Sequence, residues 1–188
     1  QPTFEFGRNG FAVGTWASYS IAADGAGANE HDLYASYTAG PVTVGVTDYY
    51  FPTAPGPDGK LAPDAQFFNY DGDGRGAHFI EPFVHWAGPE TFPLAFLAAV
   101  VVHKEPDNSV YLEASYPFVV ADADLSLTAG LVPMESGFYG TGGAALVNVG
   151  LSASKSLPLT DRFSLPVSVS YVLNPYMERT FLVFGISL

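Results

Sequence analysis

Hydrophobic and polar residues alternate along residues 29–52, and this alternation predicts two long antiparallel strands joined by a tight turn at residues 39–41. The first strand has opposite faces of different character, with Leu33, Ala35 and Tyr37 on one and Glu30, Asp32, Tyr34, Ser36 and Thr38 on the other. The second strand repeats the pattern, with Val42, Val44 and Val46 opposite Thr43, Gly45 and Thr47. Each strand has about the ten residues that a tilted strand needs to cross a bilayer.

Similar runs recur along the chain, at residues 11–21, 77–86, 92–103, 110–119, 125–131, 145–156, 163–173 and 179–188. Together they predict about ten strands, with about eight as the alternative count, and residues 1–10 are interpreted as a lead-in. Longer connections are expected after the first, third and seventh strands, with the fifth and ninth as further candidates, which is typical of an outer-membrane barrel. The sequence therefore predicts an all-β fold, an antiparallel up-and-down transmembrane β-barrel that forms one domain over residues 1–188.

The composition indicates a protein whose surface has fewer charged residues than that of an ordinary soluble domain. Hydrophobic residues make up 48% of the chain and charged residues only 14%, whereas a soluble domain has about 25% charged residues. The formal net charge of −12 excludes a basic footprint for nucleic acid. The absence of cysteine excludes disulfides and thiolate chemistry. The chain starts at Gln1, which we interpret as a processed terminus from which a signal peptide has been removed.

Two sets of residues are expected to face the lumen and the membrane interfaces. The predicted lumen-lining residues are Glu30, Asp32, Glu81, His85, Glu113 and Asn148. The predicted membrane-interface aromatics are Trp16, Tyr49, Tyr50, Phe51 and Trp86. Buried carboxylates must pair or become protonated. The lumen acids therefore either form a network that plugs a narrow barrel or give an open pore a preference for cations.

The sequence has few patterns that are typical of a metal site or of an enzyme. Residues 69–74 resemble the first half of a calcium loop, with oxygen ligands at Asn69, Asp71 and Asp73. The closing carboxylate is out of register, because Ile80 occupies the twelfth position of the loop, so an ordinary acidic turn is the favoured interpretation and a divalent-cation site the alternative. No Gly-x-Ser-x-Gly elbow is present. We expect no catalytic residues, and no cofactor other than calcium at this loop.

Several sequence blocks resemble the TorF family of porins, a group of outer-membrane β-barrels formerly catalogued as conserved hypothetical proteins. The blocks are Gly14–Ser18, Glu30 with Asp32, Leu33 and Tyr34, Val44–Val46 and Tyr49–Pro52, with weaker echoes at residues 111–114 and 150–155. The resemblance implies a signal-bearing outer-membrane barrel whose transport activity is unproven. It supplies no catalytic residues.

These observations favour a protein of the bacterial outer membrane that is not an enzyme. The first hypothesis is a small porin, a passive channel for small solutes that is either open or plugged, with the lipid bilayer as its surroundings. The second is a non-conducting structural or docking subunit, in a homo-oligomer or a larger outer-membrane assembly. The third is a soluble secreted β-barrel that binds an apolar ligand, which requires the apolar register to face inward.

Overall fold

The computed structural model describes residues 1–20, 29–52, 65–71 and 76–187, and these residues form an all-β protein. Its strands are β1 (Thr3–Arg8), β2 (Phe11–Ser18), β3 (Glu30–Ala39), β4 (Val42–Tyr50), β5 (His78–Ala87), β6 (Ala95–Val100), β7 (Val110–Val120), β8 (Ala123–Val132), β9 (Glu135–Ser136), β10 (Thr141–Gly142), β11 (Ala145–Thr160), β12 (Phe163–Asn174) and β13 (Arg179–Ile186).

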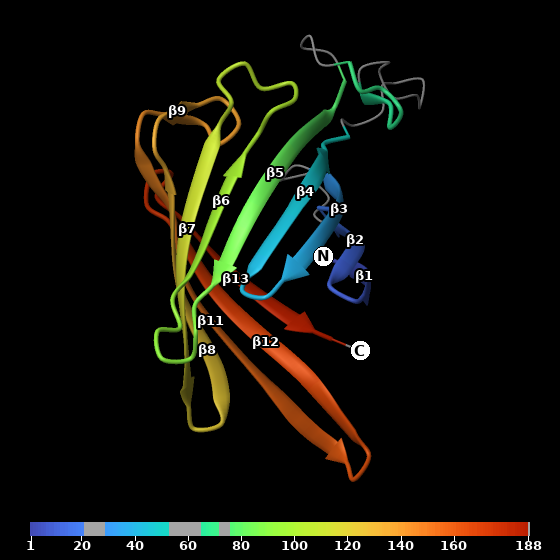
Figure 1. Ribbon diagram of the computed structural model, residues 1–188, viewed down its shortest axis with the longest axis vertical. Helices are drawn as coiled ribbons and strands as arrows, with labels where there is room; N and C mark the ends of the chain where they lie inside the picture. Colours follow the sequence, from blue (N-terminus) through green and yellow to red (C-terminus); the bar gives the residue numbers. More distant parts are fainter. Residues whose placement is uncertain (21–28, 53–64, 72–75, 188) are drawn as a thin grey trace. The chain divides into compact units, whose positions relative to one another are not determined.

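Over the described ranges, eleven strands pair in one antiparallel sheet in the order β1-β2-β3-β4-β5-β6-β7-β8-β11-β12-β13, and β9 pairs with β10 separately (Figure 1). The spatial order follows the chain order, so the sheet is an up-and-down meander. The predicted antiparallel all-β class is therefore confirmed.

The sequence prediction lacks the two-residue strands β9 and β10 and, in the main sheet, β1, because residues 1–10 are not a lead-in but contain half of a hairpin. Each residue of β1 pairs with β2, from Thr3 with Trp16 to Arg8 with Phe11. The turn between them is Asn9-Gly10, and both residues have positive φ, 54° and 82°. A two-residue turn with two positive φ values matches the right-handed twist of a hairpin and favours Asn-Gly. This hairpin raises the strand count from the expected ten to eleven.

Connections of different length alternate along the meander. The turns at residues 9–10, 40–41, 121–122 and 161–162 are short, and the connections at residues 19–29, 51–77, 101–109 and 133–144 are longer. The long connections after β2, β4 and β8 are those that the sequence predicts, and the connection after β6 is also longer. The connection after β12, a further candidate, is short, at residues 175–178. Two further connections break this alternation, because residues 88–94 follow β5 where a short turn would come and only residues 175–178 follow β12 where a long connection would come.

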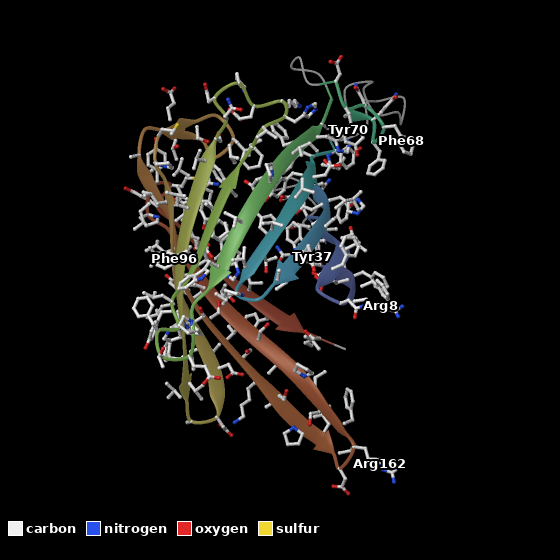
Figure 2. The ribbon with its side chains drawn as sticks, in the orientation of Figure 1. Arg8, Tyr37, Phe68, Tyr70, Phe96 and Arg162 are labelled. Atoms are coloured by element: carbon white, nitrogen blue, oxygen red, sulfur yellow. The ribbon has the colours of Figure 1, made fainter. Side chains whose placement is uncertain are left out.

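The chain divides into two compact units, residues 1–85 with 99–110, and residues 86–98 with 111–188. In the first unit, β3 and β4 pair as the alternation predicts, with Ala35 opposite Val46 and Tyr37 opposite Val44. The apolar face of this hairpin is exposed to the surroundings. Val44 is 49% exposed, and Tyr37 also projects from the apolar face (Figure 2). On the neighbouring β1, Phe6 is 61% exposed.

The second unit exposes an apolar row that crosses five strands. Strand pairing aligns one residue each from β7, β8, β11, β12 and β13, and these are Tyr116, Leu127, Leu151, Tyr171 and Leu182. Their exposed fractions range from 43% to 58%. On the opposite face of the same strands, Ser152 pairs with both Ser126 and Ser170, and its hydroxyl lies 2.9 Å from the Ser170 hydroxyl. Each unit therefore has an exposed apolar face and a polar face.

Candidate functional site

The polar face of the first unit gathers aromatic and acidic side chains from four strands. Asp32 of β3 pairs with Trp16 of β2 on one side and with Tyr49 of β4 on the other. The Tyr49 hydroxyl donates a hydrogen bond of 2.8 Å to a carboxylate oxygen of Glu81 on β5. Directly paired residues share a face of a sheet. We call Trp16, Asp32, Tyr49 and Glu81 the aromatic–acid row.

Asp32 is the residue of this row whose polar atoms are least satisfied. It is 7% exposed, and its Oδ1 atom is buried without a hydrogen-bond partner in the described part of the chain. Three other acids, Glu30, Asp48 and Glu81, lie close enough for their charges to act on it. Removing a carboxylate from water is costly unless hydrogen bonds or an opposite charge compensate. The site therefore concentrates negative charge around an oxygen that has no partner within the described protein.

Three of the predicted lumen residues come together here and two come together in the second unit. Glu30, Asp32 and Glu81 share the polar face of the first unit, and His85 follows Glu81 by four residues on the same face of β5. In the second unit, the Tyr111 hydroxyl donates to Glu113 at 2.6 Å, and the Asn148 amide donates to the Tyr111 hydroxyl at 3.1 Å.

A glycine makes this second cluster possible. Gly130 pairs with both Glu113 and Asn148. A Cβ atom at Gly130 would clash with the Tyr111 ring and hydroxyl. Because glycine has no side chain, the ring can lie over β8 and bring its hydroxyl to the acid and the amide. The acid at position 113 is thus held in a hydrogen-bonded network on the polar face.

The aromatic residues predicted for the membrane interfaces fall in different places. Trp16 and Tyr49 lie on the polar face with Asp32, and their interface role stays a prediction. Phe51 stacks on Tyr49 at 6.4 Å, and Tyr50 is buried and donates to the carbonyl of Ala65. These placements follow from strand pairing, which a single sequence does not specify.

Trp86 differs from the other four aromatics. It stacks at 6.0 Å on Phe96 of β6, whose exposed ring is labelled in Figure 2. An aromatic pair of this kind is compatible with an interface role. The membrane role of Trp86 stays a prediction.

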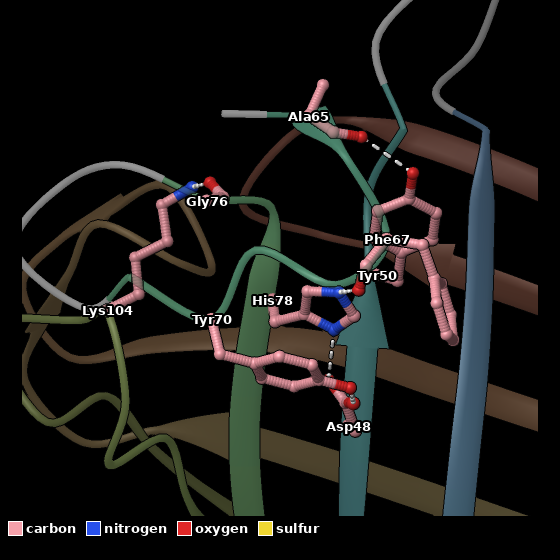
Figure 3. Close-up of polar contacts among 8 residues, drawn as sticks. All are labelled: Asp48, Tyr50, Ala65, Phe67, Tyr70, Gly76, His78 and Lys104. Atoms are coloured by element: carbon pink, nitrogen blue, oxygen red, sulfur yellow. Dashed lines mark hydrogen bonds and ion pairs between the residues drawn. The ribbon is translucent and has the colours of Figure 1, made fainter. Parts of the chain in front are cut away.

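The structure adds a cluster that the sequence does not predict, which we call the His78 network: Asp48, Tyr50, Phe67, Tyr70 and His78 (Figure 3). His78 has a fully buried side chain, and its Nδ1 atom lies 2.8 Å from Asp48. Its Nε2 atom lies 2.6 Å from the carbonyl oxygen of Phe67. The ring stacks on Tyr50 at 4.8 Å and on Tyr70 at 3.9 Å.

The hydrogen bonds of this network use both nitrogens of the imidazole, one toward the Asp48 carboxylate and one toward the Phe67 carbonyl oxygen. The ring lies between the two tyrosine rings and stacks on both. Because Phe67 and Tyr70 come from the segment 65–71, the network attaches this segment to β4 and β5. Nearby, Lys104 donates to the carbonyl of Gly76 and lies over the Phe79 ring.

Tyr70 gives the network a measurable pH signature. Burial, and then the hydrogen bond of 2.8 Å to Asp48, raise the pKa of Tyr70 to about 12. A raised pKa in the folded state means that this contribution to stability is present below pH 10 and is lost as the pH rises toward 12. Subtracting the phenolate absorbance titration of Tyr70→Phe from that of the natural chain should give a midpoint near 12.

The variant Asp48→Asn serves as the control for this titration. It removes the charge and weakens the hydrogen bond, so the Tyr70 midpoint should move part of the way back toward 10. A midpoint near 10 in the natural chain would contradict the Tyr70–Asp48 contact.

The predicted calcium loop is described only in part. The Asn69 side chain accepts a hydrogen bond of 3.1 Å from the backbone N–H of Asp71, so it stabilises a local turn. Asp73 lies outside the described residues. Over the described part of the chain, no group of three or more histidine and acidic residues has the geometry to hold a metal ion. Calcium binding at residues 69–74 stays a prediction.

Comparison with known proteins gives one match. The model of a bacterial protein family of unknown function, Gcw_chp, matches residues 1–157. No curated protein and no solved structure matches the chain. None of the described segments is a helix with the length and apolar character needed to span a bilayer.

Proposed function

This chain belongs to the Gcw_chp family of bacterial proteins, whose function is unknown. We propose that it is an outer-membrane β-barrel that acts as a passive channel for small solutes. The observation that carries the proposal is the apolar row from Tyr116 to Leu182, which crosses five strands with every side chain at least 43% exposed. A contiguous apolar face of this width is unfavourable in water. Against lipid it is the ordinary outer surface of a membrane barrel.

Strand length and the opposite face support the same proposal. β3, β4, β7 and β8 contain 10, 9, 11 and 10 residues, close to the 9–11 residues or so that a tilted strand needs to cross a bilayer. If the apolar face meets lipid, the polar face with its serines, threonines and carboxylates lines the interior. The resemblance to TorF porins points to the same class of protein. The Tyr111–Glu113–Asn148 network and the aromatic–acid row would narrow the passage.

The soluble alternative places its apolar residues around a ligand cavity, and the exposure of the apolar row opposes that arrangement. The docking alternative has one observation in its favour. Phe68, in the segment that the His78 network holds, is 89% exposed (Figure 2). An exposed aromatic on a fixed segment is a suitable contact for another protein. A non-conducting docking subunit is therefore the second candidate function.

Cell fractionation and heat-modifiable gel migration test the membrane proposal. We expect the protein, expressed with an outer-membrane signal peptide, to be recovered with outer membranes and to migrate differently in unboiled and boiled samples. Recovery in the soluble fraction without detergent would overturn the proposal. For a membrane-embedded protein, planar-bilayer recordings then separate the two candidates, because a channel gives discrete conductance steps and a docking subunit gives none.

A further inference from the structure

The aromatic–acid row alternates two ring systems with two carboxylates on one face of four neighbouring strands. Strand pairing places Trp16 next to Asp32 and Asp32 next to Tyr49, at the distance of about 5 Å between Cβ atoms that paired residues share. Tyr49 in turn holds Glu81 through its hydroxyl. Glu30 lies on the same face, two residues before Asp32 in β3. Trp16 and Glu30 are only partly buried, so the row is open to solvent beside Asp32.

The unsatisfied oxygen of Asp32 indicates that this row has a ligand. The residue is more than nine-tenths buried, and its Oδ1 atom has no hydrogen-bond partner in the described structure. A buried acceptor without a donor is costly, and such features in native proteins usually mark a functional role. Asparagine at this position would bury no charge among the neighbouring acids. The carboxylate is therefore explained by a positively charged partner that is not among the described residues.

The geometry of the row selects the kind of cation. A calcium or magnesium ion requires several oxygen ligands that converge to about 2–2.6 Å from one centre, and the described residues contain no such group. A guanidinium or ammonium group instead directs several N–H donors to acceptors that lie apart. Its charge is also attracted to the faces of aromatic rings, best to tryptophan. The alternation of rings and acids matches these two requirements together.

We propose that Trp16, Asp32, Tyr49 and Glu81 form a binding site for a small organic cation, an amine or a guanidinium compound. The inference rests on the proposed function, in which the polar face lines the passage and is reached by solutes. Asp32 and Glu81 accept hydrogen bonds from the cation, and the Trp16 ring covers it. The substrate class of the channel is then organic cations rather than anions or neutral sugars.

The intrinsic fluorescence of Trp16 tests the site without any transport measurement. The sequence has two tryptophans, so Trp86→Phe leaves Trp16 as the only indole. We expect agmatine, which has both a guanidinium and an ammonium group, to change the fluorescence of the detergent-folded full chain in a saturable way. In the Trp86→Phe background, Asp32→Asn should weaken binding by roughly 30-fold or more, because it removes the charge that pairs with the cation.

The matched control is Asp122→Asn, which removes an exposed carboxylate that pairs with Lys155 in the other unit and should leave agmatine affinity unchanged. Asp32→Asn should fold and melt no lower than the natural chain, because Oδ1 has no hydrogen bond to lose. No saturable response, equal affinity in Asp32→Asn, or displacement of agmatine by equimolar calcium would each overturn the proposal. An Asp32→Asn variant that melts several degrees lower would instead indicate a structural role and would also overturn it.

The failure of this site and the failure of the channel proposal are distinguishable. A protein that fractionates with outer membranes and conducts, yet does not respond to agmatine, has the proposed function without the site. A protein recovered without detergent that binds agmatine through Asp32 has the site but not the proposed function, and the inference in its present form, a channel for organic cations, is then wrong.

Discussion

Replacement of Leu151 by arginine should lower the free energy of unfolding in phospholipid vesicles by about 2–4 kcal/mol. Leu151 lies in the middle of the exposed apolar row, paired with Leu127 on one side and Tyr171 on the other. If this row faces hydrocarbon, the new guanidinium must either lose its hydration or distort the bilayer. The measurement is a denaturant titration of the natural chain and the variant, folded into the same vesicles.

Leu159 provides the matched control on the same strand. It lies near the end of β11, beside the turn at residues 161–162, and is also exposed. Arginine at this position should cost only about 0–1 kcal/mol, because the penalty on a lipid-facing surface falls toward the membrane interfaces. If both surfaces face water, each arginine variant should change the free energy of unfolding by no more than about 0.5 kcal/mol. That outcome would remove the main support for the barrel.

The sequence predicts the two faces of each strand well, because strand geometry alone fixes a period of two. The pairing of Ala35 with Val46 and Tyr37 with Val44 places the turn at residues 40–41, one residue shorter than the predicted turn at 39–41, because Ala39 still belongs to β3 and pairs with Val42. The same period does not say which face is covered. An apolar face can pack inward around a ligand or outward against lipid, and the alternation is identical. Only the exposure of residues such as Val44 and Leu151 distinguishes these arrangements.

The first hairpin and the face on which Trp16 lies show two different limits of prediction from the sequence. Asn9-Gly10 is a strong turn signal between alternating residues, so β1 was within reach of sequence reasoning, although a strand of six residues gives a weak period. The face of Trp16 is harder to predict. Its neighbours Thr15 and Ala17 are small, and only the pairing of Trp16 with Asp32 assigns it to the acidic face.

The His78 network joins residues that are far apart in the sequence. Asp48 follows Val44 and Val46 on the apolar face of β4, where a carboxylate is out of place unless it has a partner. That anomaly is a sequence signal, but it does not identify the partner. His78 lies 30 residues later, and Phe67 comes from a connection whose path local preferences do not determine. The network therefore depends on tertiary structure that no local pattern encodes.

Replacement of His78 by phenylalanine should lower the free energy of unfolding by about 2–6 kcal/mol, because it leaves two hydrogen-bonding groups without their partner at about 1–3 kcal/mol each. Phenylalanine retains a ring that can stack on Tyr50 and Tyr70, so the substitution isolates the loss of hydrogen bonds. It leaves Asp48 without its imidazole partner and the carbonyl of Phe67 without a donor. Denaturant unfolding gives the loss, and limited proteolysis should show faster cleavage within residues 65–71.

His85→Phe is the control, because His85 lies on the same strand, is half-buried and faces the polar side. His85→Phe should lower the free energy of unfolding by about 1 kcal/mol, which is the centre of the distribution for single substitutions. If His78→Phe cost no more than this control and residues 65–71 stayed equally resistant to protease, the His78–Asp48 pair would not hold the segment. Phe68 would then lose its fixed position, and with it the docking alternative would lose its only structural support. A large loss at His78 with a small one at His85 would instead make residues 65–71 a rigid part of the protein.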